Sequence, residues 1–164
     1  MSEKDHKQEE LKSQMHRIEK VNFMNMCMVQ DSSGNILALD KVNDQYTGTT
    51  FPGGHVEDSE TFTDSIIREV EEETGLTISN PVLTGVYHWS ELGIRNLVFL
   101  YRADIYKGTL KSSEEGNVYW ISRADFLKKD LAPGMEAVLK LMDNGKISEC
   151  YMEIQSGRLV EKLQ

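Results

Sequence analysis

The chain has 164 residues, a length that suits one domain with its own core, and its 39% hydrophobic and 27% charged residues argue against global disorder. The 27 acidic residues outnumber the 18 Lys and Arg residues, and the net charge of −9 disfavours binding to nucleic-acid polymers and anionic membranes. A small phosphorylated ligand remains compatible with this charge, because a bound divalent cation reverses the local field.

The cysteines and the N-terminal residues indicate the cellular compartment in which we expect the protein. Cys27 and Cys150 form no CxxC pair and no zinc-binding cluster, and two isolated thiols fit a reducing compartment, although one disulfide is also compatible with the sequence. Residues 1–20 are charged throughout and have no apolar centre, so they do not resemble a signal peptide. No apolar run approaches the ~20 residues that span a bilayer. We therefore expect a cytoplasmic protein.

Residues 1–20 form a polar leader with a narrow apolar stripe. Leu11, Met15 and Ile18 are spaced i, i+4, i+7, as on one face of a helix. Two interpretations stay open: a frayed or partly helical leader, or a helix that docks on a partner subunit. The sequence does not distinguish a monomer from a homodimer.

The remaining residues, 21–164, predict a single domain that begins with strands. Residues 21–29 and 36–42 are mostly apolar and predict two strands, and the turn cluster at 31–35 predicts that they form a hairpin. The polar residues 43–50 predict a loop.

A helix is predicted next, and further strands and one more helix are predicted after it. Residues 60–74 contain no Gly or Pro and carry apolar residues at helical spacing, and Gly75 stands where a helix is expected to end. Further along the chain we expect strands at 81–89, 96–105 and 118–121, a helix at 132–142, and a terminal hairpin formed by 150–154 and 158–160. This order predicts an α/β protein with a mixed β-sheet packed between helices.

The predicted helix at 60–74 carries three glutamates on one face. Glu69, Glu72 and Glu73 are spaced i, i+3, i+4, and like charges at this spacing destabilise a helix unless solvent, an arginine or a cation compensates them. Arg68 lies four residues before Glu72 and can pair with it. A rigid group of carboxylates suits Mg²⁺ or Mn²⁺, and the carbonyl of Gly53 is a further candidate ligand. The alternative is an ordinary solvated acidic face.

The wider pattern favours the metal site. Residues 54–76 read G-x5-E-x7-R-E-U-x-E-E-x-G-U, where U is aliphatic, and a chance match in a chain of this length has odds on the order of one in 10⁷. All nine fixed positions resemble the signature of the Nudix hydrolases, and the preceding Phe-Pro-Gly-Gly and the order of strands over residues 20–145 are similar to that family as well.

The resemblance implies a Nudix-like α/β/α sandwich and Mg²⁺-dependent hydrolysis of a nucleoside diphosphate linked to another moiety, with Mn²⁺ as a substitute cation. Glu69, Glu72 and Glu73 would be metal ligands, and Glu60 would be a further ligand, directly or through water. Arg68 would orient these glutamates by charge-assisted hydrogen bonds.

Many members of the family also use a glutamate in a loop before a late strand, as a ligand or general base. Glu115 is the best match, Glu114 is the alternative, and Glu69 is the next candidate for the base. An ordinary acidic loop is the competing interpretation. Lys41, Arg95 and Arg102 are candidates for phosphate contacts, but the sequence favours solvated charges for each of them. His55 and His88 are interpreted as structural or surface residues.

The leading substrate is a small-molecule nucleoside triphosphate, for example 8-oxo-dGTP, cleaved to the monophosphate and pyrophosphate. ADP-ribose and nucleotide sugars are alternatives, since the motif specifies the diphosphate and not the base. A non-catalytic nucleotide sensor is a hypothesis of another class, and the presence of every motif glutamate argues against it.

Overall fold

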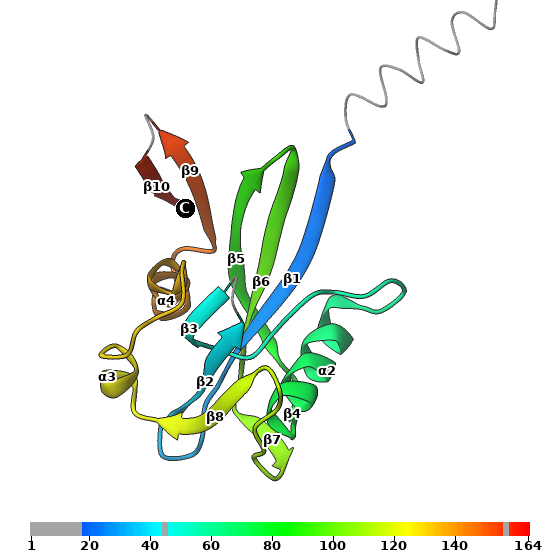
Figure 1. The fold of residues 1–164 in the computed structure, drawn as a ribbon, viewed down its shortest axis with the longest axis vertical. Helices are drawn as coiled ribbons and strands as arrows, with labels where there is room; N and C mark the ends of the chain where they lie inside the picture. The colour runs from blue at the N-terminus through cyan, green and yellow to red at the C-terminus, as the bar shows by residue number, and fades with distance from the viewer. Residues whose placement is uncertain (1–17, 44–45, 156–157) are drawn as a thin grey trace, which may run out of the picture.

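A computed structural model describes residues 18–43, 46–155 and 158–164 of the chain. Most of the predicted leader, residues 1–17, therefore lies outside the described residues. A five-stranded sheet forms the centre, and a three-stranded and a two-stranded sheet lie beside it (Figure 1). Across the described ranges, no helix is long and apolar enough to cross a bilayer.

The central sheet is mixed, as predicted. Its strands, in spatial order, are β1 (Lys20–Val29), β6 (Ile94–Ala103), β5 (Val82–Glu91), β9 (Glu149–Gln155) and β10 (Arg158–Leu163). β1 runs parallel to β6, β5 runs antiparallel to β6, and β5 runs parallel to β9. The predicted terminal hairpin is confirmed as β9 and β10, which pair antiparallel.

The predicted hairpin between the first two strands is limited to a single antiparallel bridge between Gln30 and Ile36, and the strands themselves belong to different sheets. β2 (Ile36–Asn43) pairs with β3 (Tyr46–Thr50) and β8 (Gly116–Ile121) in the three-stranded sheet. The Asp31 carboxylate does reverse the chain by accepting the Ser33 and Asn35 N–H groups. The outer edge of β1, however, is bound by the loop that follows β3: the Cys27 N–H donates to the Pro52 carbonyl at 2.9 Å. β2 therefore finds its partners in another sheet.

Three further differences concern short elements. Residues 46–50, predicted as loop, form β3, whose pairing with β2 overrides their polar composition. The predicted strand at 96–105 ends at Ala103, and β7 (Ile105–Gly108) follows it and pairs with β4 (Leu76–Ser79), which the sequence analysis missed. The four-residue helix α3 (Arg123–Phe126) is too short to leave a periodic signal.

The two longer helices cover opposite faces of the central sheet and are α2 (Phe62–Thr74) and α4 (Met135–Asp143). Successive side chains of a strand point to opposite faces. On β1, Cys27 is buried in a cluster with Ile66 and Val70 of α2, whereas Met28 is buried in a cluster with Val138 of α4. The predicted α/β/α arrangement is thereby confirmed (Figure 1).

Helix α2 begins and ends as its sequence predicts. Thr61 caps its N-terminus by accepting the Asp64 N–H at 3.0 Å, and Gly75 ends it in the left-handed region, with φ of 73°. The buried Ile66 and Val70 fix the rotation of the helix on the sheet, so that the glutamate face is turned toward the loop between β3 and α2.

Candidate functional site

A double-glycine turn lies directly against the glutamate face. The Asn25 N–H of β1 donates to the Gly54 carbonyl at 2.8 Å, which holds the turn on the sheet edge. Gly53 has φ of +152°, and a Cβ there would lie 2.2 Å from the Asn25 carbonyl oxygen, so only glycine fits. A Cβ on Gly54 would lie 2.5 Å from Oε2 of Glu69. The turn therefore passes over the carboxylates without room for a side chain.

The three predicted glutamates differ in burial. The Glu73 side chain is 5% exposed, that of Glu69 is 14% exposed and that of Glu72 is 61% exposed. Burial raises the pKa of Glu73 and of Glu69, because desolvation disfavours a charged carboxylate. Glu71 belongs to another part of the helix surface, where it accepts a hydrogen bond from Thr77 Oγ1 at 3.2 Å.

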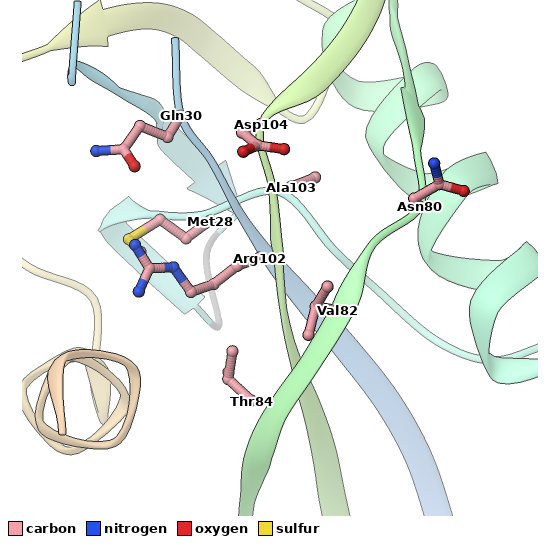
Figure 2. Close-up of a pocket in the computed structure, with 8 residues that line it drawn as sticks. All are labelled: Met28, Gln30, Asn80, Val82, Thr84, Arg102, Ala103 and Asp104. Carbon is pink, nitrogen blue, oxygen red and sulfur yellow. The ribbon is translucent and has the colours of Figure 1, made fainter. Parts of the chain in front are cut away.

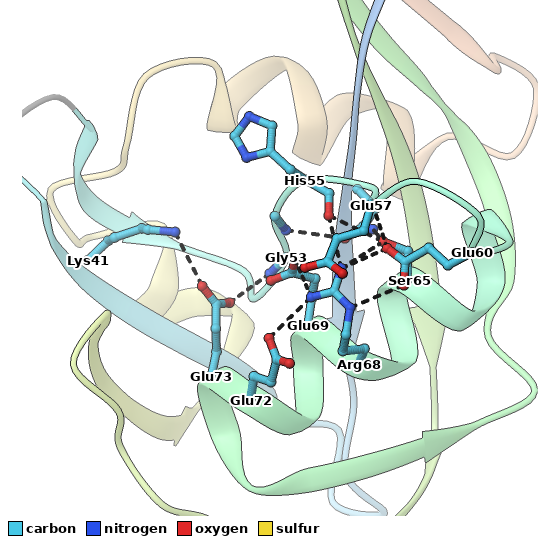
Figure 3. Close-up of polar contacts among 12 residues, drawn as sticks. Lys41, Gly53, His55, Glu57, Glu60, Ser65, Arg68, Glu69, Glu72 and Glu73 are labelled. Carbon is cyan, nitrogen blue, oxygen red and sulfur yellow. Dashed lines mark hydrogen bonds and ion pairs between the residues drawn. The ribbon is translucent and has the colours of Figure 1, made fainter.

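Arg68 joins the acidic side chains into one network (Figure 3). Its Nε and Nη2 donate to the two carboxylate oxygens of Glu60 at 3.1 and 2.7 Å, and its Nη1 donates to Glu69 at 2.8 Å and to Glu72 at 3.1 Å. The hydrogen bonds from Arg68 lower the pKa of Glu60 to about 2, and they raise the pKa of Arg68 itself. The guanidinium thus holds three carboxylates in defined positions.

Lys41 of β2 holds the fourth carboxylate and is the functional candidate that the sequence interpretation undervalued. Its Nζ lies 3.2 Å from Oε1 of Glu73, whose Oε2 accepts the Gly53 N–H at 2.8 Å. The same Nζ lies 3.3 Å from Oε2 of Glu115. Burial lowers the pKa of Lys41, but the two carboxylates outweigh this effect and raise it. The register between β2 and β8 explains why the sequence interpretation missed Lys41: it pairs Lys41 with Gly116, next to Glu115, and both residues are distant from Lys41 in the sequence.

The structure brings Glu115 to the edge of this site and leaves Glu114 outside it. Gly116 has φ of +156°, and a Cβ there would lie 2.1 Å from the Asp40 carbonyl oxygen. This close approach to β2 places the exposed Glu115 carboxylate beside Lys41. Glu114 is also exposed, and its carboxylate has no ion pair within 4 Å in the part of the chain that the structure describes.

The other candidates lie elsewhere or contribute only backbone. The His55 carbonyl accepts from Arg68 Nη2 at 3.1 Å, while its ring is directed away from the carboxylates (Figure 3). Arg102 lies in a pocket of about 280 Å³ that none of the motif glutamates lines (Figure 2), and it donates to the Met142 carbonyl at 3.4 Å. His88 lies on β5 and contacts Glu149 of β9 at 2.8 Å.

The donor chemistry of the site suits a hard divalent cation. The side-chain atoms that could coordinate a metal here are carboxylate oxygens, and neither Cys nor a His ring belongs to the network drawn in Figure 3. Among the described residues, no three His, Cys, Asp or Glu side chains already converge as a ready-made metal group. The carboxylates are instead occupied by Arg68, Lys41 and the Gly53 N–H. Arg68 and Lys41 thus already supply positive charge to this face, and the assignment of individual metal ligands stays a prediction.

Comparison with known proteins gives a consistent result. Residues 24–142 match the NUDIX domain family. The chain is 37% identical over 101 residues to the uncharacterized Nudix hydrolase YvcI of Bacillus subtilis (strain 168), which covers 58% of this chain and 64% of YvcI. It is 28% identical over 130 residues to an ADP-ribose pyrophosphatase of Methanocaldococcus jannaschii, covering 77% of this chain and 71% of that protein.

The fold is similar to that of solved structures. A mutator MutT protein from Bacillus halodurans superimposes with a TM-score of 0.72 and 24% identity, over 87% of this chain and 97% of that one. This likeness concerns the fold. With the domain match over most of its length, the chain belongs to the Nudix family, as residues 54–76 predict. The alignment with YvcI spans slightly less than two thirds of that relative.

Proposed function

We propose that the protein is a pyrophosphohydrolase that uses Mg²⁺, or Mn²⁺ in its place, to hydrolyse a phosphoric anhydride bond in a nucleoside diphosphate derivative. One observation carries the proposal: the buried carboxylate of Glu73 and the partly buried carboxylate of Glu69 face the Gly53–Gly54 turn within a network of charged groups. Burying several carboxylates together is unfavourable unless cations compensate them. Membership in the Nudix family supports the same activity.

The ligands proposed for the cation all belong to the turn and to the motif: the carbonyl of Gly53 and the carboxylates of Glu60, Glu69, Glu72 and Glu73. A bound Mg²⁺ would supply Lewis-acid activation of water and would offset the negative charge of the substrate phosphates. Arg68 orients three of the carboxylates through its guanidinium, at 2.7 to 3.1 Å.

Glu115 is the proposed general base. In the reaction, a water oxygen forms a bond to phosphorus and one of its protons passes to the Glu115 carboxylate, while the bridging P–O bond breaks and the bridging oxygen leaves with the electron pair as part of the departing phosphate group. Its carboxylate is half exposed and, among the described residues, forms an ion pair with Lys41 alone, so a single ion pair has to break before it turns toward a substrate. If Glu115 does not act, Glu69 in the motif is the next candidate.

Lys41 acts as a positioning residue in this proposal. Its ammonium lies between Glu73 and Glu115 and reduces the repulsion between the helix face and the loop carboxylate. Displacement of either carboxylate would leave the ammonium available to a phosphate oxygen.

For the substrate we propose a nucleoside triphosphate, such as 8-oxo-dGTP, cleaved to the monophosphate and pyrophosphate. ADP-ribose is the second candidate, because the relative from Methanocaldococcus jannaschii is named for that activity. The products distinguish the two: pyrophosphate forms from a triphosphate, whereas ADP-ribose gives AMP and ribose 5-phosphate.

The test is a screen of nucleoside triphosphates, ADP-ribose and nucleotide sugars with Mg²⁺, with products identified by chromatography. Turnover of one class, lost in the Glu73→Gln variant, supports the proposal. Tight nucleotide binding without turnover of any diphosphate would instead support a non-catalytic sensor.

A further inference from the structure

Three phenylalanine rings form a half-exposed cluster where helix α2 begins. The ring centroid of Phe62 lies 4.2 Å from that of Phe99 on β6 and 5.3 Å from that of Phe23 on β1. Phe23 and Phe62 are each 39% exposed. Exposed clusters of large apolar side chains are characteristic of surfaces that bind another segment or protein.

Leu97 extends this cluster along the same face of the sheet. It shares the side of β6 on which Phe99 packs toward α2, and it pairs in register with Phe23. We call Phe23, Phe62, Leu97 and Phe99 the aromatic surface. It lies at the end of the central sheet where β1 begins, and Ile18, just before β1, is 76% exposed.

An ion pair fixes the chain where it enters this surface. Arg95 lies on the same face of β6 as Leu97, and its Nε and Nη2 contact the Glu19 carboxylate at 3.0 Å. Its Nη1 contacts Nδ1 of His88 at 3.0 Å, and Nε2 of His88 contacts Glu149 at 2.8 Å. Because a guanidinium can only donate, Nδ1 accepts and the ring proton resides on Nε2. Arg95 is thus bound to His88 of β5 through Nη1 and to Glu19, just before β1, through Nε and Nη2.

The N-terminal segment matches this surface in pattern and length. A helix that returned from Glu19 would place Leu11 about 12 Å away, at 1.5 Å per residue. Phe23 lies about 13 Å from Glu19 along the strand, at 3.3 Å per residue. The apolar stripe of Leu11, Met15 and Ile18 would therefore extend as far from Glu19 as the aromatic surface does and could lie along it. We propose that residues 1–17 pack on the aromatic surface of their own chain, with Leu11 and Met15 as the main contacts.

Nuclear Overhauser contacts in the full-length protein test this proposal. With ¹³C-labelled leucine and methionine methyl groups, the Leu11 methyl signals, assigned by their loss in Leu11→Ile, should show contacts to ring protons of Phe23 or Phe62. Arg95→Met, which releases Glu19, should weaken these contacts. Methyl signals of Leu11 at the shifts of an unfolded peptide, without ring contacts, would overturn the proposal.

A mixed sample identifies the occupant. If the contacts arise only between labelled and unlabelled chains, a second copy covers the surface and the proposal is wrong. Dye binding supplies a second readout: Leu11→Asp should uncover the rings and raise the fluorescence of a hydrophobic dye, whereas Ser13→Asp, on the opposite side of the stripe, should not. An equal response of the two variants would contradict the proposal. Neither measurement depends on the proposed activity.

Discussion

Lys41 Nζ lies 3.3 Å from the carboxylate of Glu115, so strand β2 holds the loop before β8 beside the glutamate face of α2. If Glu115 is the general base, Glu115→Gln should reduce kcat by roughly 10²–10⁴-fold with little change in KM, because the substitution removes proton transfer and not substrate binding. Steady-state kinetics test this. Glu114→Gln, which alters the neighbouring exposed carboxylate, is the control and should have a mild effect. Near-normal kcat in Glu115→Gln would rule out this assignment.

Removal of the Lys41 ammonium should destabilise the metal-free protein. Lys41→Met leaves the Glu73 carboxylate, which is 5% exposed, with the Gly53 N–H as its remaining partner in the described network. We expect a loss of about 1–3 kcal/mol in the free energy of unfolding, measured by urea denaturation in the presence of a chelator. Lys107→Met, at an exposed position on β7, is the matched control. Equal effects of the two substitutions would mean that the Lys41 ion pairs contribute nothing specific.

The two glycines of the turn should respond differently to alanine. In Gly53→Ala the Cβ would meet backbone atoms of Asn25, so the turn must leave the sheet edge and the melting temperature should fall. In Gly54→Ala the Cβ would meet the end of the Glu69 side chain, which can rotate away, so activity should fall while the fold is largely retained. Thermal melts and initial rates on both variants separate the two effects. A Gly54→Ala enzyme with full activity would argue against a role for the Glu69 position.

Charge removal along α2 should affect activity on one face only. Glu72→Gln and Glu73→Gln keep the side-chain shape and should each lower turnover by on the order of 10²-fold or more, while the proteins stay folded by circular dichroism. Glu71→Gln should be nearly neutral, because Glu71 is bonded to Thr77, outside the network. Similar losses in all three variants would contradict the assigned helix face.

The local features of the fold were predictable because local chemistry determines them. The end of α2 follows from Gly75, which occupies the left-handed region, and its rotation follows from the buried Ile66 and Val70. Strand partners depend on contacts distant in sequence. β1 pairs in parallel with β6 and its other edge is bound by the Pro52–Val56 segment, and no turn signal near residue 31 contains that information.

The candidate site shows the same division. The spacing of Glu69, Glu72 and Glu73 is readable because all three share one helix. The role of Lys41 is not readable, since it depends on a strand register that places residue 41 opposite residue 116. A lysine in a strand is most often a solvated charge, and the two carboxylate partners of Lys41 come from other elements.

The central claim is that the glutamate face of α2 supports catalysis through a divalent cation. The most direct measurement is the initial rate of anhydride hydrolysis as Mg²⁺ is titrated into chelator-treated protein, with wild type and Glu73→Gln compared side by side. The account predicts negligible turnover without the cation, saturable activation of the wild type, and a rise in its melting temperature as the carboxylates are neutralised. An undiminished rate in chelator, or wild-type activation in Glu73→Gln, would contradict it.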